Sequence, residues 1–216
     1  MQKISLVLFD MHDVLCRFDQ AKRLEDLARI SGKSTDEIFA AIWGAGFEAE
    51  ADAGKLDSVA YLKGFGERLG YPITLDEWVA NRKLAMVPMP EVLAIMADLK
   101  SRVKVAVLTN NHTLVREHLN VLFPELFALC GDHAYVSAQF GVAKPNPEVY
   151  LRCVAAAGGR PEETLFIDDS KANVDGAVAA GLAGYLFTDA AALRVALRDF
   201  GLICKSASDR DPGVAS

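Results

Sequence analysis

The chain of 216 residues lacks the features that mark secreted, membrane and zinc-binding proteins. Its four cysteines are scattered and form no Cys-x-x-Cys pair: Cys16, Cys130, Cys153 and Cys204. Such a pattern predicts neither a disulfide framework nor a zinc site, and it favours reduced thiols in a cytoplasm. No apolar run approaches the roughly 20 residues that span a bilayer, and the first apolar stretch ends at Asp10, unlike a signal peptide. We therefore expect a cytoplasmic protein without a membrane partner.

A surplus of positive charge is also missing. The chain has 23 basic and 29 acidic side chains, which give a formal net charge of -6. Because nucleic-acid-binding domains usually carry a basic surplus, we expect no nucleic-acid partner. A small anionic substrate remains compatible, since local charge can differ from the net charge. The 51% hydrophobic content is ordinary for a globular protein with one sizeable core.

Five short apolar runs are typical of buried strands. They cover residues 4–9, 103–108, 134–136, 164–167 and 184–187. From residue 103 onward these runs alternate with stretches that have helical periodicity, such as the apolar stripe over residues 114–122. Asn146 followed by Pro147 predicts a helix start, and Gly181 predicts the end of a helix that begins at Lys171. This alternation predicts an α/β protein with a Rossmann-like, three-layer α/β/α arrangement around a parallel sheet.

Residues 17–87 interrupt this alternation and predict helices only. Two capping boxes support the prediction, Ser34 with Glu37 and Thr74 with Glu77. We therefore expect a discontinuous α/β core domain, residues 1–16 and 88–204, with an inserted α-helical cap domain, residues 17–87. Residues 205–216 are small and polar, which predicts a disordered tail.

Polar side chains follow the predicted strands, where parallel sheets bind their ligands. In chain order they are Asp10, Thr109 with Asn110, Lys144 in a Gly-Val-Ala-Lys-Pro loop, and Asp168 with Asp169. Each alone has an ordinary explanation as a cap, a turn or a surface residue. Four such positions at one edge of a sheet predict a site.

The chemistry of this set is coherent. Three carboxylates form a hard oxygen cluster that suits Mg²⁺ better than zinc. A lysine and a threonine add a cation and a hydrogen-bond donor for an anionic group. This is the layout of phosphoryl transfer, in which a carboxylate can also be the nucleophile.

Four segments carry a family resemblance: VLFDMHDVL, VAVLTNN, GVAKPNPEVY and TLFIDDSKANVDGA. In order and spacing they resemble the motifs of the haloacid dehalogenase-like (HAD) hydrolase superfamily. The chain is most similar to its phosphatase branch with a helical cap between the first two motifs, which is like subfamily IA. The resemblance extends to about residue 190 and implies a Mg²⁺-dependent phosphomonoesterase. Such an enzyme hydrolyses a small phosphorylated metabolite through an aspartyl-phosphate intermediate.

The resemblance also implies a role for each residue of the set. Asp10 matches the nucleophile and a metal ligand, and the backbone carbonyl of His12 matches another ligand. Thr109 and Asn110 match residues that hold the phosphoryl group and substrate. Lys144 matches the catalytic lysine that neutralises nucleophile and phosphate. Asp169 matches the main metal-binding acid, Asp168 a further ligand or outer acid, and Asn173 a residue that orients the loop.

The chain departs from the family pattern after the nucleophile. The family's phosphatases usually have aspartate where this chain has His12, and glycine where it has Asp13. His12 is either a replacement general acid-base residue, since histidine is the commonest one, or a turn residue that contributes only its carbonyl.

Two other functions therefore compete with the phosphatase. The chain could be a catalytically altered binding or regulatory protein, or a dehalogenase or phosphonate-cleaving relative. The pair Asp168-Asp169 argues against a metal-free dehalogenase. Arg17 and Arg82 are basic cap residues and candidates to meet a substrate anion. The sequence predicts no oligomeric state.

Overall fold

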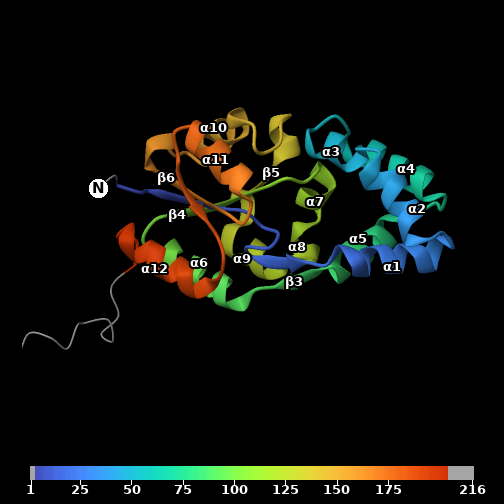
Figure 1. Cartoon of the computed structure of the whole chain (residues 1–216), viewed down its shortest axis with the longest axis horizontal. Helices are drawn as coiled ribbons and strands as arrows, with labels where there is room; N and C mark the ends of the chain where they lie inside the picture. Colours follow the sequence, from blue (N-terminus) through green and yellow to red (C-terminus); the bar gives the residue numbers. More distant parts are fainter. Residues whose placement is uncertain (1–2, 204–216) are drawn as a thin grey trace, which may run out of the picture.

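The computed structural model describes residues 3–203, which form a sheet-based core and a helical insertion (Figure 1). The core sheet has the order β5-β4-β1-β6-β7, and every neighbouring pair is parallel. Its strands are β1 (Leu6–Phe9), β4 (Lys104–Thr109), β5 (Ala134–Val136), β6 (Thr164–Asp168) and β7 (Ala183–Leu186). Each predicted run overlaps one of these strands, so the expected parallel sheet is confirmed.

The central strands are apolar throughout because both faces of the sheet are covered. Val7 and Phe9 of β1 belong to one hydrophobic cluster, whereas Leu6 and Leu8 belong to another. Helices α6 (Pro90–Lys100), α9 (Pro124–Cys130) and α12 (Ala190–Asp199) contribute to the first cluster. Helices α10 (Pro147–Ala156) and α11 (Lys171–Ala179) contribute to the second. Figure 1 shows α10 and α11 on one side of the sheet and α6 and α12 on the other, which confirms the three layers.

The predicted helix starts and stops are largely confirmed. Asn146 caps α10, with Pro147 in its first turn, and Gly181 after α11 has a φ of 88°. The apolar stripe over residues 114–122 forms two helices instead of one, α7 (Thr113–Glu117) and α8 (Leu119–Leu122). They are separated at His118, whose φ of -113° leaves the helical region.

The insertion between β1 and β4 is mainly helical. It contains α1 (Gln20–Ser31), α2 (Thr35–Phe39), α3 (Phe47–Asp52), α4 (Ser58–Leu69) and α5 (Leu75–Leu84). A π-helical turn, Ala40–Gly44, joins α2 to α3, and both predicted capping boxes are present. These helices lie beyond one end of the sheet (Figure 1). No helix within residues 3–203 is both long and apolar enough to cross a membrane.

A short antiparallel ribbon joins the insertion to the core. It consists of β2 (Cys16–Phe18) and β3 (Met86–Pro88), in which Arg17 pairs with Val87. The prediction of helices only was therefore wrong at both ends of residues 17–87, because three-residue strands are too short to show a periodicity. The domain boundaries predicted at 16/17 and 87/88 fall inside this ribbon, and the predicted tail lies outside the described residues.

Candidate active site

The site is built at the edge where the central strands end. Phe9 is in register with Val107 of β4 and Ile167 of β6, so these three strands reach the same level. Asp10 follows β1 directly, and its backbone N–H donates to the Ile167 carbonyl at 2.8 Å. Asp168 ends β6 with no exposed surface, and Asp10 is only 7% exposed. The sheet thus presents two carboxylates side by side in a largely dry environment.

Lys144 lies between these two carboxylates. Its Nζ is 2.7 Å from Asp10 Oδ1 and 2.7 Å from Asp168 Oδ2, and its side chain is buried. Burial raises the pKa of Asp10 to about 6, an effect that Lys144 opposes and Asp168 reinforces. Burial alone would lower the pKa of Lys144, but the two carboxylates outweigh it and raise that pKa. The lysine therefore stays charged and fixes the position of the predicted nucleophile.

Asp168 is almost fully engaged by donors of the protein. Besides Lys144, it accepts from the Ser170 backbone N–H at 2.8 Å and from Asn173 Nδ2 at 3.1 Å on both oxygens. These contacts place Asn173 beside Asp168. The family resemblance implied that Asn173 orients this loop. The same contacts also suit Asp168 to a role in holding Lys144.

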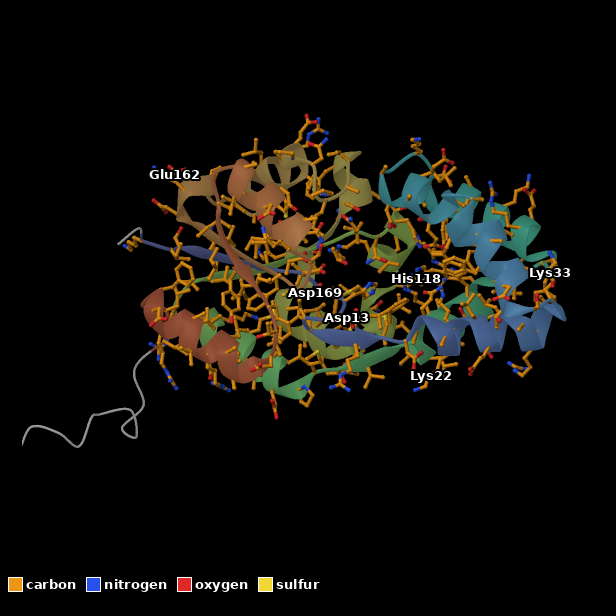
Figure 2. The ribbon with its side chains drawn as sticks, viewed as in Figure 1. Asp13, Lys22, Lys33, His118, Glu162 and Asp169 are labelled. Atoms are coloured by element: carbon orange, nitrogen blue, oxygen red, sulfur yellow. The ribbon has the colours of Figure 1, made fainter. Side chains whose placement is uncertain are left out.

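Asp169 has the opposite character. Asp169 is exposed on the surface. Partial burial of its carboxyl group and the nearby charge of Asp168 raise its pKa. One carboxylate oxygen from each of Asp10, Asp168 and Asp169 can be chosen so that all three lie within 4.8 Å of one another. In Figure 2, Asp169 and Asp13 lie near the junction of core and insertion. Hard oxygen donors at this spacing fit Mg²⁺, with Asp169 as the accessible carboxylate.

The last residue of β4 and the residues after it are held by amide contacts. Thr109 is 3% exposed, and its hydroxyl accepts from Asn111 Nδ2 at 2.8 Å, which leaves its proton free to donate. The Asn110 side-chain amide bonds the backbone of Lys144. Its Nδ2 donates to the Lys144 carbonyl at 3.0 Å, and its Oδ1 accepts from the Lys144 backbone N–H at 2.8 Å. Asn110 therefore anchors the loop that carries the lysine.

The turn after Asp10 explains the unusual residues at positions 12 and 13. Asp13 has a φ of +57°, the left-handed conformation that favours glycine and that aspartate tolerates better than most residues. Its Oδ1 accepts from the Phe18 backbone N–H at 3.2 Å. This turn places the His12 ring 4.3 Å from the Phe18 ring in a stacked arrangement.

The His12 ring is neutral at neutral pH. Burial, Arg82 and Lys144 together hold its pKa well below the usual value. Arg82 Nη2 lies 3.4 Å from His12 Nε2, and since a guanidinium only donates, this contact assigns the lone pair to Nε2. His12 is thus suited to accept a proton and not to donate one as imidazolium.

Several cap residues near the site were missed or left unplaced by sequence reasoning. Arg82 is buried and donates to Asn111 Oδ1, whereas Arg17 is exposed on β2. Arg23 was missed although it is fully buried. A usable signal existed, because Arg23 precedes Leu27 by four residues and so lies on the apolar face of α1.

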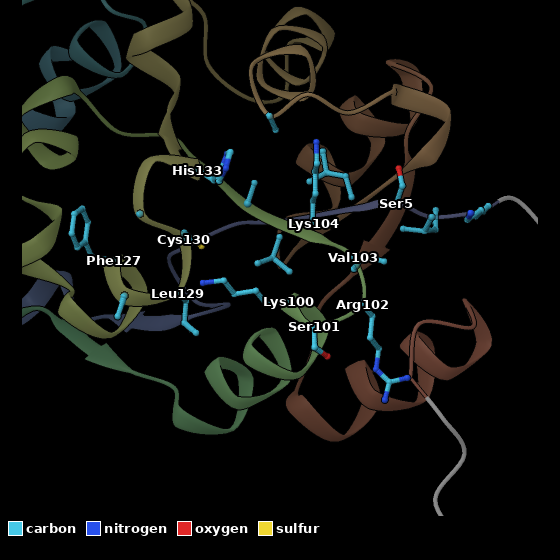
Figure 3. A pocket seen from close by; sticks show the side chains of 18 residues that line it. Ser5, Lys100, Ser101, Arg102, Val103, Lys104, Phe127, Leu129, Cys130 and His133 are labelled. Atoms are coloured by element: carbon cyan, nitrogen blue, oxygen red, sulfur yellow. The ribbon is translucent and has the colours of Figure 1, made fainter.

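A separate cavity lies at the opposite end of the sheet (Figure 3). It has a volume of about 900 Å³ and is lined near the start of β4 by Lys100, Arg102 and Lys104. None of the described residues that line it carries a carboxylate. Because ligands of parallel sheets bind at the carboxyl ends of the strands, this cavity is not the candidate active site.

Comparison with known proteins agrees with this geometry. Residues 4–181 match the haloacid dehalogenase-like hydrolase family. A protein of Mycobacterium tuberculosis named Phosphatase MT3486 is 31% identical over 85% of this chain and 87% of its own length. The D-ribitol-5-phosphate phosphatase of Bacteroides thetaiotaomicron is 25% identical over 79% of this chain and 85% of its own length.

Solved structures show the same fold. One is a HAD family enzyme of Bacteroides thetaiotaomicron, in complex with magnesium and inorganic phosphate. It superposes with a TM-score of 0.70 at 24% identity, over 84% of this chain and 93% of that one. The match confirms the predicted α/β architecture.

Proposed function

Because the chain belongs to the haloacid dehalogenase-like hydrolase family, we propose that it is a Mg²⁺-dependent phosphatase of a small phosphorylated metabolite. The observation that carries the proposal is the ion pair of Lys144 with both Asp10 and Asp168, beside the exposed carboxylate of Asp169. The relative that is 31% identical is named a phosphatase, and the structural neighbour was crystallised with magnesium and phosphate.

The nucleophile of this reaction is Asp10. A carboxylate oxygen attacks phosphorus and forms an aspartyl-phosphate, while the bond between phosphorus and the leaving oxygen breaks. With its pKa raised to about 6, Asp10 is mostly ionised at neutral pH and more basic than an ordinary aspartate. Lys144 offsets the charge of nucleophile and phosphoryl group, and the Thr109 hydroxyl donates to a phosphoryl oxygen.

The oxygen donors of this edge would hold the metal. Asp10, Asp169 and the backbone carbonyl of His12 would be its ligands, with Asp168 as a further ligand or as the acid that positions Lys144. When bound, Mg²⁺ offsets the repulsion among the carboxylates and the negative charge of the phosphoryl group. The carboxylate oxygens of Asp10, Asp168 and Asp169 already lie close enough together for one ion.

Hydrolysis of the aspartyl-phosphate needs a base, and His12 is suited to that step. Its neutral ring can take a proton from the attacking water, and this water's oxygen then bonds to phosphorus and releases Asp10. In the first step the leaving alkoxide takes its proton from water, because a histidine of low pKa supplies one poorly. We therefore assign His12 the role of base in the second step.

The proposal is tested by hydrolysis of p-nitrophenyl phosphate with MgCl₂ or with excess EDTA. We expect activity only with the metal. Asp10→Asn should abolish turnover without changing the melting temperature greatly, because it keeps the volume and removes the nucleophile. Asp175→Asn is the matched control, since Asp175 is exposed and pairs with the exposed Lys171.

Three outcomes would contradict this proposal. Undiminished turnover in EDTA would exclude a metal-dependent phosphatase and favour the dehalogenase alternative. Turnover by Asp10→Asn at a tenth of the original rate would exclude Asp10 as nucleophile. A chain that hydrolyses no phosphate ester with MgCl₂ would be a catalytically altered binding protein.

A further inference from the structure

Two buried arginines face the junction of cap and core without a carboxylate at ion-pair distance. Arg23 of α1 is 0% exposed and Arg82 of α5 is 3% exposed. Among the described residues, no ion pair includes either of them. Arg23 Nε donates to Asn81 Oδ1 at 2.9 Å, but no acceptor within residues 3–203 meets its Nη1 or Nη2. An arginine is rarely buried without a partner, because removing its charge from water is costly.

Other buried donors surround these guanidinium groups. The Arg23 guanidinium lies over the rings of Trp43, Phe65 and Trp78 at 5.2, 5.4 and 5.9 Å. The His112 ring lies 5.4 Å from that of Trp78. In the part of the chain that the structure describes, Trp78 Nε1, Arg82 Nε and both His112 nitrogens also lack a hydrogen-bond partner. We call Arg23, Trp78, Arg82 and His112 the donor cluster.

The nearby carboxylates do not saturate the donor cluster. Glu48 already accepts from the Tyr61 hydroxyl at 2.6 Å. Burial and Glu48 raise the pKa of Asp52 to about 7, and the two arginines oppose this only in part. At neutral pH Asp52 therefore carries only part of a negative charge and does not balance the two arginines. The cluster has unused donors and spare positive charge.

The donor cluster adjoins the phosphoryl site. Arg82 contacts His12 and Asn111, and Asn111 donates to the Thr109 hydroxyl at 2.8 Å. One side chain thus separates Arg82 from the proposed phosphoryl-binding hydroxyl. Whatever binds the cluster would belong to the leaving group of the same substrate and would be only a few atoms from the phosphorus.

We propose that the donor cluster binds a second anionic group, a carboxylate or a second phosphate, on the leaving group of a short phosphomonoester. Arginine suits such groups because its planar fork donates two parallel hydrogen bonds to them. Trp78 and His112 add neutral donors to the same anion. The proposal rests on the phosphatase function and specifies its substrate class.

A cluster of buried donors also discriminates against neutral substrates. A substrate that lacks the second anion leaves the donors unpaired, and such sites reject the deficient analogue strongly. We expect kcat/KM for the doubly anionic substrate to exceed that for its neutral counterpart by about 100-fold or more.

Matched substrates test this directly. 3-Phosphoglycerate and glycerol 3-phosphate differ in a carboxylate, and fructose 1,6-bisphosphate and fructose 6-phosphate differ in a phosphate. A preference in the first pair assigns a carboxylate and one in the second a phosphate. Arg23→Met and Arg82→Met should each reduce the preference at least tenfold. Arg29→Met, on the exposed side of α1, is the matched control and should retain it.

A binding experiment separates this proposal from the phosphatase function. Calorimetry with Asp10→Asn compares the same substrate pairs without hydrolysis. Tighter binding of the doubly anionic member, lost on adding Arg23→Met, supports the cluster even if no ester is hydrolysed. Equal affinity within each pair, or equal kcat/KM within each pair in an active wild type, would overturn it and leave the arginines as structural residues.

Discussion

Replacing Lys144 with methionine should destabilise the fold strongly and in a pH-dependent way. The change keeps the aliphatic stem but removes the cation that lies 2.7 Å from both Asp10 and Asp168. Each contact has a gross Coulomb energy of about 6 kcal/mol at an effective dielectric of about 20, much of it offset by desolvation. Removing one partner of a buried ion pair costs about 3–5 kcal/mol, so we expect a loss in that range at pH 8.

The pH dependence follows from the direction of the Asp10 shift. Its folded pKa of about 6 lies above the ordinary value of 3.8, so the folded chain binds the extra proton. Stability from this group is therefore present below pH 4 and is lost as pH rises through about 6. Without Lys144 the folded pKa rises further, so the difference between wild type and Lys144→Met should be small near pH 4 and full at pH 8.

Urea unfolding in EDTA at pH 4.5 and pH 8 measures both effects. Lys171→Met is the control, because Lys171 is exposed and its pair with Asp175 should contribute less than about 1 kcal/mol. Added MgCl₂ should recover part of the stability of Lys144→Met at pH 8, since the ion replaces the missing cation. A loss below about 1 kcal/mol at pH 8, or an equal loss at both pH values, would refute the argument that Lys144 compensates buried charge.

Three further predictions concern the turn and the metal. His12→Ala should slow phosphatase turnover by about 10²–10⁴ if His12 activates the hydrolytic water; an acid quench and borohydride reduction should then show phosphorylated Asp10 accumulating in the variant. An unphosphorylated Asp10 in a slow variant would contradict this role. Asp13→Ala should destabilise the fold by about 1 kcal/mol, because alanine is strained at a φ of +57°, while Asp13→Gly should be less destabilising in the same urea titration. Equal losses would show that the hydrogen bond to Phe18 matters more than the conformation. Adding MgCl₂ to the wild type should raise its melting temperature, and Asp169→Asn should reduce that rise; an unchanged rise would remove Asp169 from the ligand set.

The sequence by itself determined the α/β core and which residues gather at its edge. Strands buried on both faces must be apolar throughout, so their ends are visible where Asp10, Thr109 and Asp168 interrupt the apolar runs. Parallel pairing then brings these ends together, and no side-chain geometry is needed to predict it. Caps such as Asn146 were equally visible, because they depend on local hydrogen bonds.

Only the tertiary structure decided which partner each of these residues contacts. Asn110 and Thr109 are similar in sequence context, yet the Asn110 amide is used by the Lys144 backbone, 34 residues away. Likewise Asp168 and Asp169 are neighbours, but only Asp168 faces Lys144 and Asn173. The two buried arginines, on α1 and α5, lie 59 residues apart in the chain, and their proximity to the site depends on how the cap packs. Such contacts depend on long-range packing and on burial. Packing and burial determine the charge state of a side chain and whether its donors are paired, and a local sequence pattern contains no information on either.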